Sequence, residues 1–521
     1  MRIDTVFRGQ ARRHPGKTAV ICGDQRVTYA ALAERVARLA HGLMKRGVTP
    51  GDRIVVYLPN GLPVIELMLA AFTAGALVVP VTTRLTPREL AYMCANSQPS
   101  AIAFAHDQAG ALSDVIEANP HAVPISVGGP WSGAVLFDEL AETDRGPLPE
   151  IPSGSEDAMI MYTSGTTGQP KGAVLTHANI VTQHAYVNGI EWGISHDDVY
   201  LVTTPLSHRT GFARLSNSML LGGTLVVMSK FDASDAVEII QREGVTVAGM
   251  VPTVCRMLLP LIEADPARCA SLRRIVVTGE AFPVELKKRL IAALPQVRLF
   301  SFFAMTEVGG VTSLSHEEQF THPASIGRPT PGVEIRIVDE AGAQVAEEEP
   351  GELLVRNGLP GQYSVLRAYY RRPDETASAF TDGWFRTGDM VRVDRDGYLY
   401  VVDRKKDMVL SGGFNIYTKE VEQALLTHPS IADAAVIGVP DPLFGEAVVA
   451  FVEFVSGQRV AADEIIEHAR NQIASYKKPK HVFISDELPR NSLGKVLKNE
   501  LREHARRELG IEPASSVRAR A

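Results

Sequence analysis

The sequence predicts an α/β fold divided into several domains. With 521 residues, 45% of them hydrophobic, the chain is too long for one core and apolar enough to build more than one. Apolar runs of strand length alternate with helical patterns in the N-terminal half, which is typical of parallel sheets with crossover helices. Strands expected at 434–439, 447–455 and 481–484, with a helix at 462–475, indicate a compact C-terminal α+β unit.

The first long helix is expected over about residues 26–47, because apolar residues recur there at helical spacing. Its apolar face is formed by Leu32, Val36, Leu39 and Leu43. The elements expected next are a strand at 53–58, a helix at 64–74, a strand at 77–81, a strand ending at 161 and, within 199–227, a strand, loop, helix and strand.

The composition argues against nucleic acid or a membrane span as partners. The formal net charge is −7, and basic residues are interspersed with acids. The most apolar stretch, residues 62–81, contains prolines and a glutamate, so we expect a buried helix and strand there. The N-terminus lacks the apolar core of a signal peptide, so a cytoplasmic location is expected. Four scattered cysteines fit a reduced compartment: Cys22, Cys94, Cys255 and Cys269.

A loop rich in glycine and hydroxyl side chains follows the apolar run that ends at Met161. Glycines let backbone N–H groups approach an anion, hydroxyls add donors and a lysine adds charge, so the composition predicts a phosphate cradle followed by a helix. A flexible connection is the other interpretation, and the Gly-Lys order differs from that of a Walker loop. The residues expected to hold phosphate are Thr163, Ser164, Gly165, Thr166, Thr167 and Lys171.

The string Ser-Gly-Thr-Thr-Gly-x-Pro-Lys-Gly in this loop resembles the signature of the adenylate-forming superfamily, which holds acyl-CoA synthetases, luciferases and the adenylation domains of peptide synthetases. Further motifs of that superfamily follow in order up to Lys495, so the resemblance covers essentially the whole chain. It implies a large N-terminal α/β domain of several subdomains, residues 1–405, and a small mobile C-terminal α+β domain, residues 406–521. Lys406 matches the hinge between them.

Two motifs match positions beside the acyl group and adenine. Residues 204–212 resemble the segment at the acyl pocket, and this match makes His208 an aromatic gate or a carboxylate contact. An apolar run at 275–277 precedes a turn that, by the resemblance, presents backbone to adenine; an ordinary tight turn is the other interpretation. The residues of that turn are Gly279, Glu280 and Ala281.

The segment 301–307 matches the motif that combines adenine, phosphate and metal contacts, and it departs from the usual pattern. The resemblance implies that Phe303, preceded by Phe302, stacks on adenine, that Thr306 donates to the α-phosphate and that Glu307 holds Mg²⁺. A Thr-Glu pair also suits a helix N-terminus. Ala304 replaces the usual glycine, and Phe303 lacks the usual tyrosine hydroxyl. The Cβ of Ala304 would crowd the site or forbid a positive φ at this position, so the substitution argues specifically against activation of the acid by ATP.

The later motifs match ribose, CoA and catalytic positions. The carboxylate of Asp389 suits two ribose hydroxyls, and Arg404 would supply donors beside it. Gly412 and Gly413 match the face that completes a pantetheine tunnel for CoA. Lys495 matches the lysine that neutralises the carboxylate and α-phosphate during adenylation. These strings could also be ordinary hairpin turns and solvated charges without a role in binding. The tail after about residue 510 is expected to be disordered.

The implied activity is that of an acyl-CoA ligase. A small carboxylic acid attacks the α-phosphorus of ATP to give an acyl-adenylate, and the thiol of CoA then displaces AMP. With Phe212, Phe302 and Val308 nearby by motif position, we expect a medium to bulky, largely apolar acid, with cyclic or aromatic acids included. Arg209 and Arg214 flank the same loop. Either one pairs with a second carboxylate, as in a dicarboxylate ligase, or both are surface charges, and we expect the second arrangement.

Other functions stay open. Phe303 and Ala304 favour an enzyme impaired in adenylation that only converts a preformed acyl-adenylate to the thioester. A stand-alone adenylation enzyme would load a carrier protein instead of CoA. A homodimer is also considered. A non-catalytic nucleotide-binding protein would be expected to lack Lys495, Glu307 or Asp389, and all three are present.

Overall fold

The computed structural model describes residues 1–141, 148, 151, 156–163, 169–279, 282–490 and 496–511. The chain forms two compact units. The first holds Met1–Ile335 and Leu354–Arg386, and the second holds Arg336–Leu353 and Thr387–Ala521. The boundary predicted at Lys406 lies inside the second unit, and the hinge stays a prediction. The predicted tail after residue 510 lies almost wholly outside the described residues.

A nine-stranded sheet of the first unit has the strand order β16-β15-β14-β13-β12-β10-β11-β1-β2. The pairs from β1 to β14 are parallel, as the alternation of strands and helices predicted, and β2, β15 and β16 are added antiparallel. The strands are β1 (Thr18–Cys22), β2 (Gln25–Thr28), β10 (Val199–Val202), β11 (Thr224–Val227), β12 (Val247–Met250), β13 (Arg274–Val277), β14 (Arg298–Met305), β15 (Gly309–Leu314) and β16 (Arg328–Pro329).

An eight-stranded sheet of the same unit has the order β19-β9-β8-β4-β3-β5-β6-β7. It is parallel from β8 to β7, while β9 and β19 are antiparallel additions. Its strands are β3 (Arg53–Tyr57), β4 (Leu77–Pro80), β5 (Ala101–Ala105), β6 (Val123–Val127), β7 (Val135–Leu136), β8 (Asp157–Thr163), β9 (Lys171–Thr176) and β19 (Ala368–Tyr369).

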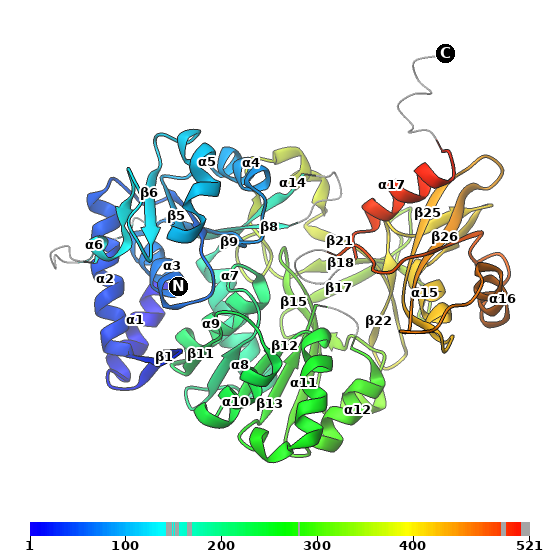
Figure 1. The fold of residues 1–521 in the computed structure, drawn as a ribbon, viewed down its shortest axis with the longest axis horizontal. Coiled ribbons are helices and arrows are strands. Elements are labelled where there is room, and N and C mark those ends of the chain that lie inside the picture. Colours follow the sequence, from blue (N-terminus) through cyan, green and yellow to red (C-terminus); the bar gives the residue numbers. More distant parts are fainter. Residues whose placement is uncertain are drawn as a thin grey trace, which may run out of the picture. The chain divides into compact units, whose positions relative to one another are not determined.

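Helices between the two sheets form the centre of the first unit. Helix α3 packs against β3 and β4, α9 packs against β10, β11 and β12, and α1 contacts both helices (Figure 1). Apolar residues surround α3 on every side, as expected of a buried helix. Helix α9 is buried along almost its whole length although it carries arginine, serine and asparagine. These helices are α1 (Ile3–Arg13), α3 (Leu62–Ala74) and α9 (Arg209–Leu221).

The remaining helices of the first unit cover the sheets or connect their strands. Helix α2 begins after Thr28, whose side chain accepts a hydrogen bond from Ala31 N. The helices are α2 (Tyr29–Lys45), α4 (Pro87–Ser97), η1 (His106–Leu112), α5 (Ser113–Glu117), α6 (Phe137–Leu140), α7 (His177–Val181), η2 (Thr182–Val187), α8 (Asn188–Trp192), α10 (Ala233–Glu243), α11 (Pro252–Ala264), η3 (Pro266–Cys269), α12 (Val284–Ala293), α13 (Glu318–Thr321) and α14 (Pro373–Ala379).

The helix predicted directly after the phosphate loop is wrong. A strand, β9, follows the loop and pairs antiparallel with β8, so the loop joins two strands of a hairpin. The buried residues of β9 lie between β8 and β19, where an apolar β-branched segment fits better than a helix. Helix α7 begins only after Thr176, which caps it by accepting from Asn179 N.

The second unit contains the α+β arrangement that the sequence predicted. Its sheet has the order β24-β23-β26-β25, with β27 parallel to β26. Buried apolar residues lie on both faces of this sheet, against α15 and α16 on one face and α17 on the other. The elements are β23 (Val409–Ser411), β24 (Phe414–Ile416), α15 (Thr418–Leu426), β25 (Ile431–Asp441), β26 (Gly445–Phe454), α16 (Ala462–Gln472), β27 (His481–Ile484) and α17 (Lys498–Glu508). The predicted fold class is therefore confirmed.

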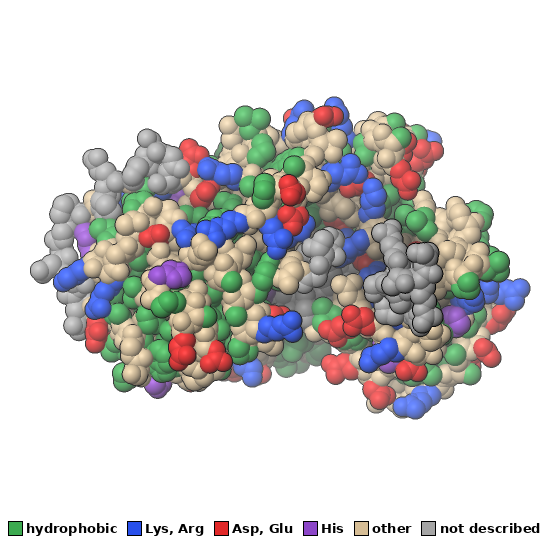
Figure 2. Space-filling model, turned by 90° about the horizontal axis from the view of Figure 1, so that it is seen from above, with side chains coloured by type: hydrophobic (Ala, Val, Ile, Leu, Met, Phe, Trp, Pro, Cys, Tyr) green, Lys and Arg blue, Asp and Glu red, His purple; other side chains and the backbone are tan. Residues whose placement is uncertain are grey.

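A further sheet has the order β17-β18-β21-β20, with β22 on β21, and several of its strands have residues in both units. Its strands are β17 (Glu334–Val338), β18 (Gly351–Arg356), β20 (Phe380–Thr381), β21 (Trp384–Val393) and β22 (Leu399–Arg404). On the face shown in Figure 2, acidic and basic side chains are interspersed, as they are along the sequence. Within the described part of the chain, no helix has the length and apolar character to cross a membrane.

Candidate active site

Glu307 joins three separate segments of the first unit. Its carboxylate oxygen Oε1 accepts hydrogen bonds from Thr163 Oγ1 at 3.3 Å and from the Tyr369 hydroxyl at 3.1 Å. Its backbone oxygen accepts from Leu366 N at 2.6 Å. Only 9% of Glu307 is exposed. The carboxylate is therefore held in place by hydroxyl groups from β8 and β19, and the described residues leave its Oε2 atom without a hydrogen bond.

Thr306 and Glu307 lie on the turn of a hairpin between β14 and β15, so the helix N-terminus considered for this pair is wrong. The register of the hairpin shifts between Phe303 and Ala304, a local irregularity of the kind that redirects side chains at sites. Among the described residues, the non-glycines with positive φ are Gln98, Glu348, Arg371 and Asp382. Ala304 therefore occupies the glycine position without backbone strain.

The two described ends of the phosphate loop are neighbours. Thr163 and Lys171 are paired across the β8–β9 ladder, and Lys171 Nζ lies 5.1 Å from the centre of the Tyr369 ring. The loop therefore begins and ends beside Glu307. The intervening predicted residues, Ser164, Gly165, Thr166 and Thr167, lie outside the described residues.

Tyr369 is a site residue that the sequence did not reveal. It is 8% exposed, and burial raises the pKa of its hydroxyl, with a further contribution from Glu307. Its position depends on the pairing of β19 with β9, which joins segments far apart in the sequence. No local motif marks such a contact.

The acyl-side loop is held by Asn60 and by a close approach at Gly211. Asn60 Oδ1 accepts from Leu206 N at 2.8 Å, and its Nδ2 donates to Thr204 O at 3.1 Å. A Cβ on Gly211 would lie 2.2 Å from the carbonyl oxygen of Pro205, so this position requires glycine. His208 follows as the N-cap of α9. Burial, with a smaller effect of Arg84, lowers the pKa of His208 to about 4, which keeps the ring neutral at pH 7.

The expectation that Arg209 and Arg214 are surface charges is wrong. Arg214 is 2% exposed, and its guanidinium lies 5.0 Å from the centre of the Trp192 ring. Arg209 is half-buried, but both of its terminal nitrogens are shielded from solvent. Burial lowers the pKa of each side chain to about 10, so both stay charged at neutral pH. The segment predicted to face the acyl group therefore contains two buried cations.

The adenine-side turn is described only in part. Gly279 is exposed with a φ of 100°, so it is in the conformation that favours glycine, while Glu280 and Ala281 lie outside the described residues. Phe302 lies next to Trp192, with 5.1 Å between ring centres, and its carbonyl oxygen accepts from Thr278 Oγ1. Phe302 therefore links the adenine-side hairpin with the ring that stacks on Arg214.

In the second unit, the structure brings the predicted ribose residues together. Asp389 on β21 and Arg404 on β22 are register partners, and Arg404 Nε lies 2.6 Å from Asp389 Oδ1. Asp389 is 2% exposed, and its backbone N–H donates to Thr387 Oγ1 at 3.1 Å. The Asp389 carboxylate is thus held by a guanidinium of the same sheet.

The predicted CoA-side glycines form the turn of the β23–β24 hairpin. Gly412 and Gly413 have φ values of 59° and 83°, as such a two-residue turn requires, and both are exposed. Lys406 is exposed, and partial desolvation of its ammonium group lowers its pKa. Lys495 lies outside the described residues.

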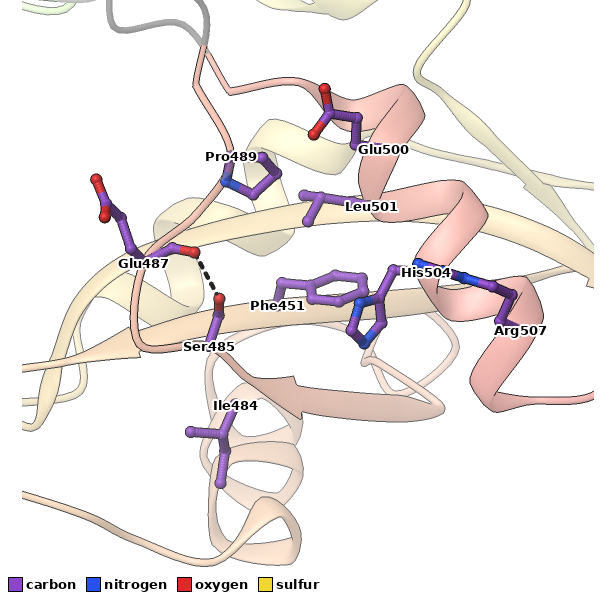
Figure 3. A pocket seen from close by; sticks show the side chains of 9 residues that line it. All are labelled: Phe451, Ile484, Ser485, Glu487, Pro489, Glu500, Leu501, His504 and Arg507. Atoms are coloured by element: carbon purple, nitrogen blue, oxygen red, sulfur yellow. Dashed lines mark hydrogen bonds between the residues drawn. The ribbon is translucent and has the colours of Figure 1, made fainter.

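A hollow of about 270 Å³ lies in the second unit between α17, β26 and the end of β27 (Figure 3). His504 contacts the Phe451 ring with 5.5 Å between centres, and Ser485 Oγ donates to Glu487 O at 2.7 Å. None of the predicted site residues that the structure describes lines it.

Two sheets enclosing buried helices, followed by a small α+β unit, define the adenylate-forming class of enzyme fold. The chain belongs to the AMP-binding enzyme family. The model described as AMP-binding enzyme matches residues 7–370, and the model described as AMP-binding enzyme C-terminal domain matches residues 420–495.

Relatives of known name are similar over almost the whole chain. A feruloyl-CoA synthase of Amycolatopsis sp. is 36% identical over 496 residues, which cover 95% of this chain and 97% of the relative. The long-chain-fatty-acid–CoA ligase FadD13 of Mycobacterium tuberculosis is 33% identical, over 92% of this chain and 93% of its own. A solved structure of o-succinylbenzoate CoA synthetase (MenE) from Bacillus subtilis, in complex with the acyl-adenylate intermediate OSB-AMP, matches with a TM-score of 0.84 at 30% identity, covering 95% and 97% of the two chains.

Proposed function

We propose that this chain is an AMP-forming acid–thiol ligase that converts a carboxylic acid to its acyl-CoA thioester through an acyl-adenylate. The observation that carries the proposal is the junction at Glu307, where the phosphate-loop hairpin and the Thr306–Glu307 turn meet in an AMP-binding enzyme. The junction supports a site at which the phosphate loop and this carboxylate act together. This is the arrangement that ATP-dependent activation of an acid requires.

In the first half-reaction, a carboxylate oxygen of the acid attacks the α-phosphorus of ATP, and pyrophosphate leaves. Thr163 to Lys171 hold the leaving phosphates, Thr306 donates to the α-phosphate and Lys495 neutralises the charge that develops. Phe302, Phe303 and Ala304, with the turn at Gly279, bind adenine. His208 is neutral at pH 7, so it contacts the carboxylate as a neutral donor or closes the pocket as an aromatic gate.

Mg²⁺ is the metal that the proposed reaction implies, and the donor set at Glu307 fits it. A carboxylate oxygen next to two hydroxyl groups is the hard-oxygen environment that Mg²⁺ prefers, and Oε2 is left for a ligand by the described contacts. Glu307 would hold the ion, which when bound supplies positive charge to the phosphates.

In the second half-reaction, the sulfur of CoA attacks the acyl carbonyl carbon, and AMP leaves with the electrons of the C–O bond. Asp389 accepts from the ribose hydroxyls, with Arg404 fixing its carboxylate. The exposed Gly412–Gly413 turn offers backbone without side chains to the pantetheine arm. Rotation of the C-terminal domain, residues 406–521, about Lys406 withdraws Lys495 from the adenylate and brings the Gly412–Gly413 turn to it.

No observation favours the alternative functions over this one. The unstrained backbone at Ala304 removes the conformational part of the argument against adenylation. CoA is proposed as the acceptor because the relatives are named as CoA ligases, so a carrier protein is the lesser candidate. A homodimer and a cytoplasmic location stay predictions.

Pyrophosphate release tests the proposal. The full chain is incubated with Mg·ATP, CoA and a panel of acids, and release is expected to depend on both the acid and ATP and to be matched by formation of the thioester. Lys495→Ala is expected to abolish release while retaining thioester formation from a synthetic acyl-adenylate. No release from any acid would count against the proposal.

A further inference from the structure

The acyl-side segment contains a group of buried N–H donors that have no partner within the described part of the chain. On α9, these are both Nη atoms of Arg209 and the Nε and Nη1 atoms of Arg214. His184 Nε2 and Trp192 Nε1 belong to the same group. We call these four side chains the α9 donor cluster. Arg214, His184 and Trp192 are at most 3% exposed, so water does not satisfy them from the surface.

A chain of hydrogen bonds identifies His184 Nε2 as a donor. Gly310 N can only donate, and it donates to Gln183 Oε1 at 2.9 Å. Gln183 Nε2 then donates to Asn188 Oδ1 at 2.9 Å, and Asn188 Nδ2 lies 3.3 Å from His184 Nδ1. Since that amide nitrogen is a donor, Nδ1 accepts, and the ring hydrogen is on Nε2. The chain starts three residues beyond Glu307, so the orientation of His184 is tied to the nucleotide-side hairpin.

His184 packs against α9 between the positions of the two arginines. Burial lowers the pKa of His184 well below its usual value, and the charges of Arg209 and Arg214 act in the same direction. Phe212, between the arginines in the sequence, packs edge-on to His184 with 6.5 Å between ring centres. A neutral imidazole whose Nε2–H group has no partner among the described residues therefore packs against the segment of α9 that carries the two arginines.

Arg214 occupies a slot that the surrounding residues shape for it. A Cβ on Gly249 would lie 2.6 Å from Arg214 Cδ, so glycine at this position leaves room for the side chain. The opposite wall is the Trp192 ring, which in turn contacts Phe302. The slot therefore adjoins the proposed nucleotide and acyl site, and it holds the arginine without an ion-pair partner.

No described acidic side chain forms an ion pair with either arginine. Burial lowers the pKa of Arg209, and the charge of Glu307 offsets only part of this effect; Glu307 already accepts from Thr163 and Tyr369. The unpaired acceptors that α9 itself carries are Asn217 Oδ1 and Ser218 Oγ, and neutral oxygens do not balance two cations. Burying an unpaired cation is strongly unfavourable, so this group is expected to serve an anionic ligand with several acceptor oxygens. A carboxylate has that chemistry, because it accepts paired hydrogen bonds from a guanidinium.

We infer that the α9 donor cluster binds a second carboxylate of the acid substrate, separate from the carboxylate that is activated. This inference rests on the proposed function and narrows it to dicarboxylic acids. Arg214 and His184 hold the second carboxylate, and Arg209 at the first position of α9 adds charge on the side of Glu307. Apolar walls such as Phe212 and Phe302 accommodate the carbon skeleton between the two carboxylates.

Matched acids test the inference. The full chain is assayed with Mg·ATP and CoA on glutarate, adipate and terephthalate, each compared with its own monoamide, which has the same size but lacks the second charge. We expect kcat/KM to favour at least one dicarboxylate by about 10- to 100-fold, as the loss of hydrogen bonds to a charged group predicts. The difference is expected mainly in KM, because the second carboxylate does not react.

Variants of Arg214 separate recognition from support of the fold. Arg214→Gln is expected to remove the preference by lowering kcat/KM for the dicarboxylate while leaving that for the monoamide within about threefold. Arg209→Gln is expected to reduce the preference in the same direction. Arg214→Lys keeps the charge but loses the planar fork, so it retains part of the preference. Arg256→Gln, on the exposed side of α11, is the matched control and is expected to behave as the unmodified chain.

The outcomes separate this inference from the proposed function. Turnover of acids without preference for any dicarboxylate overturns the inference alone. If Arg214→Gln lowers kcat/KM equally for a dicarboxylate and its monoamide, and also lowers the melting temperature, Arg214 has a purely structural role. That result also overturns the inference. Absence of turnover with every acid overturns the proposed function and this inference with it.

Discussion

Two arginines of this enzyme stand in opposite electrostatic situations. Arg404, in the second unit, lies 2.6 Å from the carboxylate of Asp389 and keeps 34% of its side chain exposed. Arg214, in the first unit, is 2% exposed and stacks on Trp192 without an acidic partner among the residues described. A paired arginine fixes a carboxylate that then binds neutral hydroxyl groups. An unpaired, buried arginine instead binds an anion that the ligand brings.

The difference assigns the two sites to different parts of the reaction. The Asp389–Arg404 pair suits the ribose, which is common to every adenylate, so its geometry is complete without the ligand. The α9 donor cluster suits the acid, the component that differs between ligases of this family. Substrate choice is therefore expected to respond to changes on α9, and ATP affinity to changes on β21 and β22.

The largest effect is expected from Glu307→Gln, which neutralises the carboxylate that Thr163 and Tyr369 contact. Loss of a charge that organises the phosphate site is expected to lower kcat/KM for ATP by about 10²- to 10³-fold. The measurement is pyrophosphate release at varied ATP. Glu317→Gln, at an exposed ion pair with Arg298, is the control and should stay near the unmodified rate. Equal losses in both variants would contradict the role given to Glu307.

Asp389→Asn breaks the paired arginine site while keeping its size. The neutral amide is a weaker acceptor for ribose hydroxyls, so KM for ATP is expected to rise about 10- to 100-fold, with the preference among acids unchanged. Initial rates over a range of ATP concentrations measure this. Asp486→Asn, at an exposed pair with Arg459, supplies the control. A changed acid preference in Asp389→Asn would contradict the proposed division of roles between the two sites.

Removing each arginine in turn is expected to change stability in opposite directions. Arg214→Met eliminates an unpaired buried cation, so the free energy of unfolding is expected to rise by about 1 kcal/mol or more. Arg404→Met removes the guanidinium that lies 2.6 Å from the buried carboxylate of Asp389, and a loss of about 1–2 kcal/mol is expected. Urea unfolding midpoints in the absence of ligands give both values. Destabilisation by Arg214→Met would mean that the buried arginine already has a partner in the free protein.

The smallest effect concerns His208, at the N-cap of α9. Its pKa is lowered to about 4 in the folded protein, against about 6.5 in the unfolded chain. Between these values the unfolded chain binds a proton that the folded protein does not, so His208 destabilises the fold as pH falls from about 6.5 toward 4. Relative to His208→Gln, the unmodified chain should lose stability at pH 5 but not at pH 7. Parallel losses in both proteins would exclude a lowered pKa.

The sequence was most informative where function depends on contiguous residues. Glu307, the Asp389–Arg404 pair and the Gly412–Gly413 turn lie within recognisable motifs, so local strings were enough to propose them as site residues, although the hairpin turn at Glu307 was not predicted. The α+β elements of the second unit were predicted from apolar periodicity and match the structure.

The failures share a physical cause, which is that burial is set by tertiary packing. Tyr369 reaches Glu307 only through the pairing of β19 with β9. Helix α9 contains arginine, serine and asparagine, so its composition resembles a surface helix, yet packing between two sheets buries it. The strand β9 was taken for a helix although it forms a hairpin with β8; its second partner, β19, is remote in the sequence.

The central claim, that this chain activates its own acid, is tested most directly by running both half-reactions in parallel. One assay supplies acid, Mg·ATP and CoA, and the other supplies the synthetic acyl-adenylate and CoA without ATP. The account predicts thioester in both, with pyrophosphate released in the first. The account would be contradicted if the chain formed thioester only from the supplied adenylate, and if Ala304→Gly then formed thioester from acid and ATP.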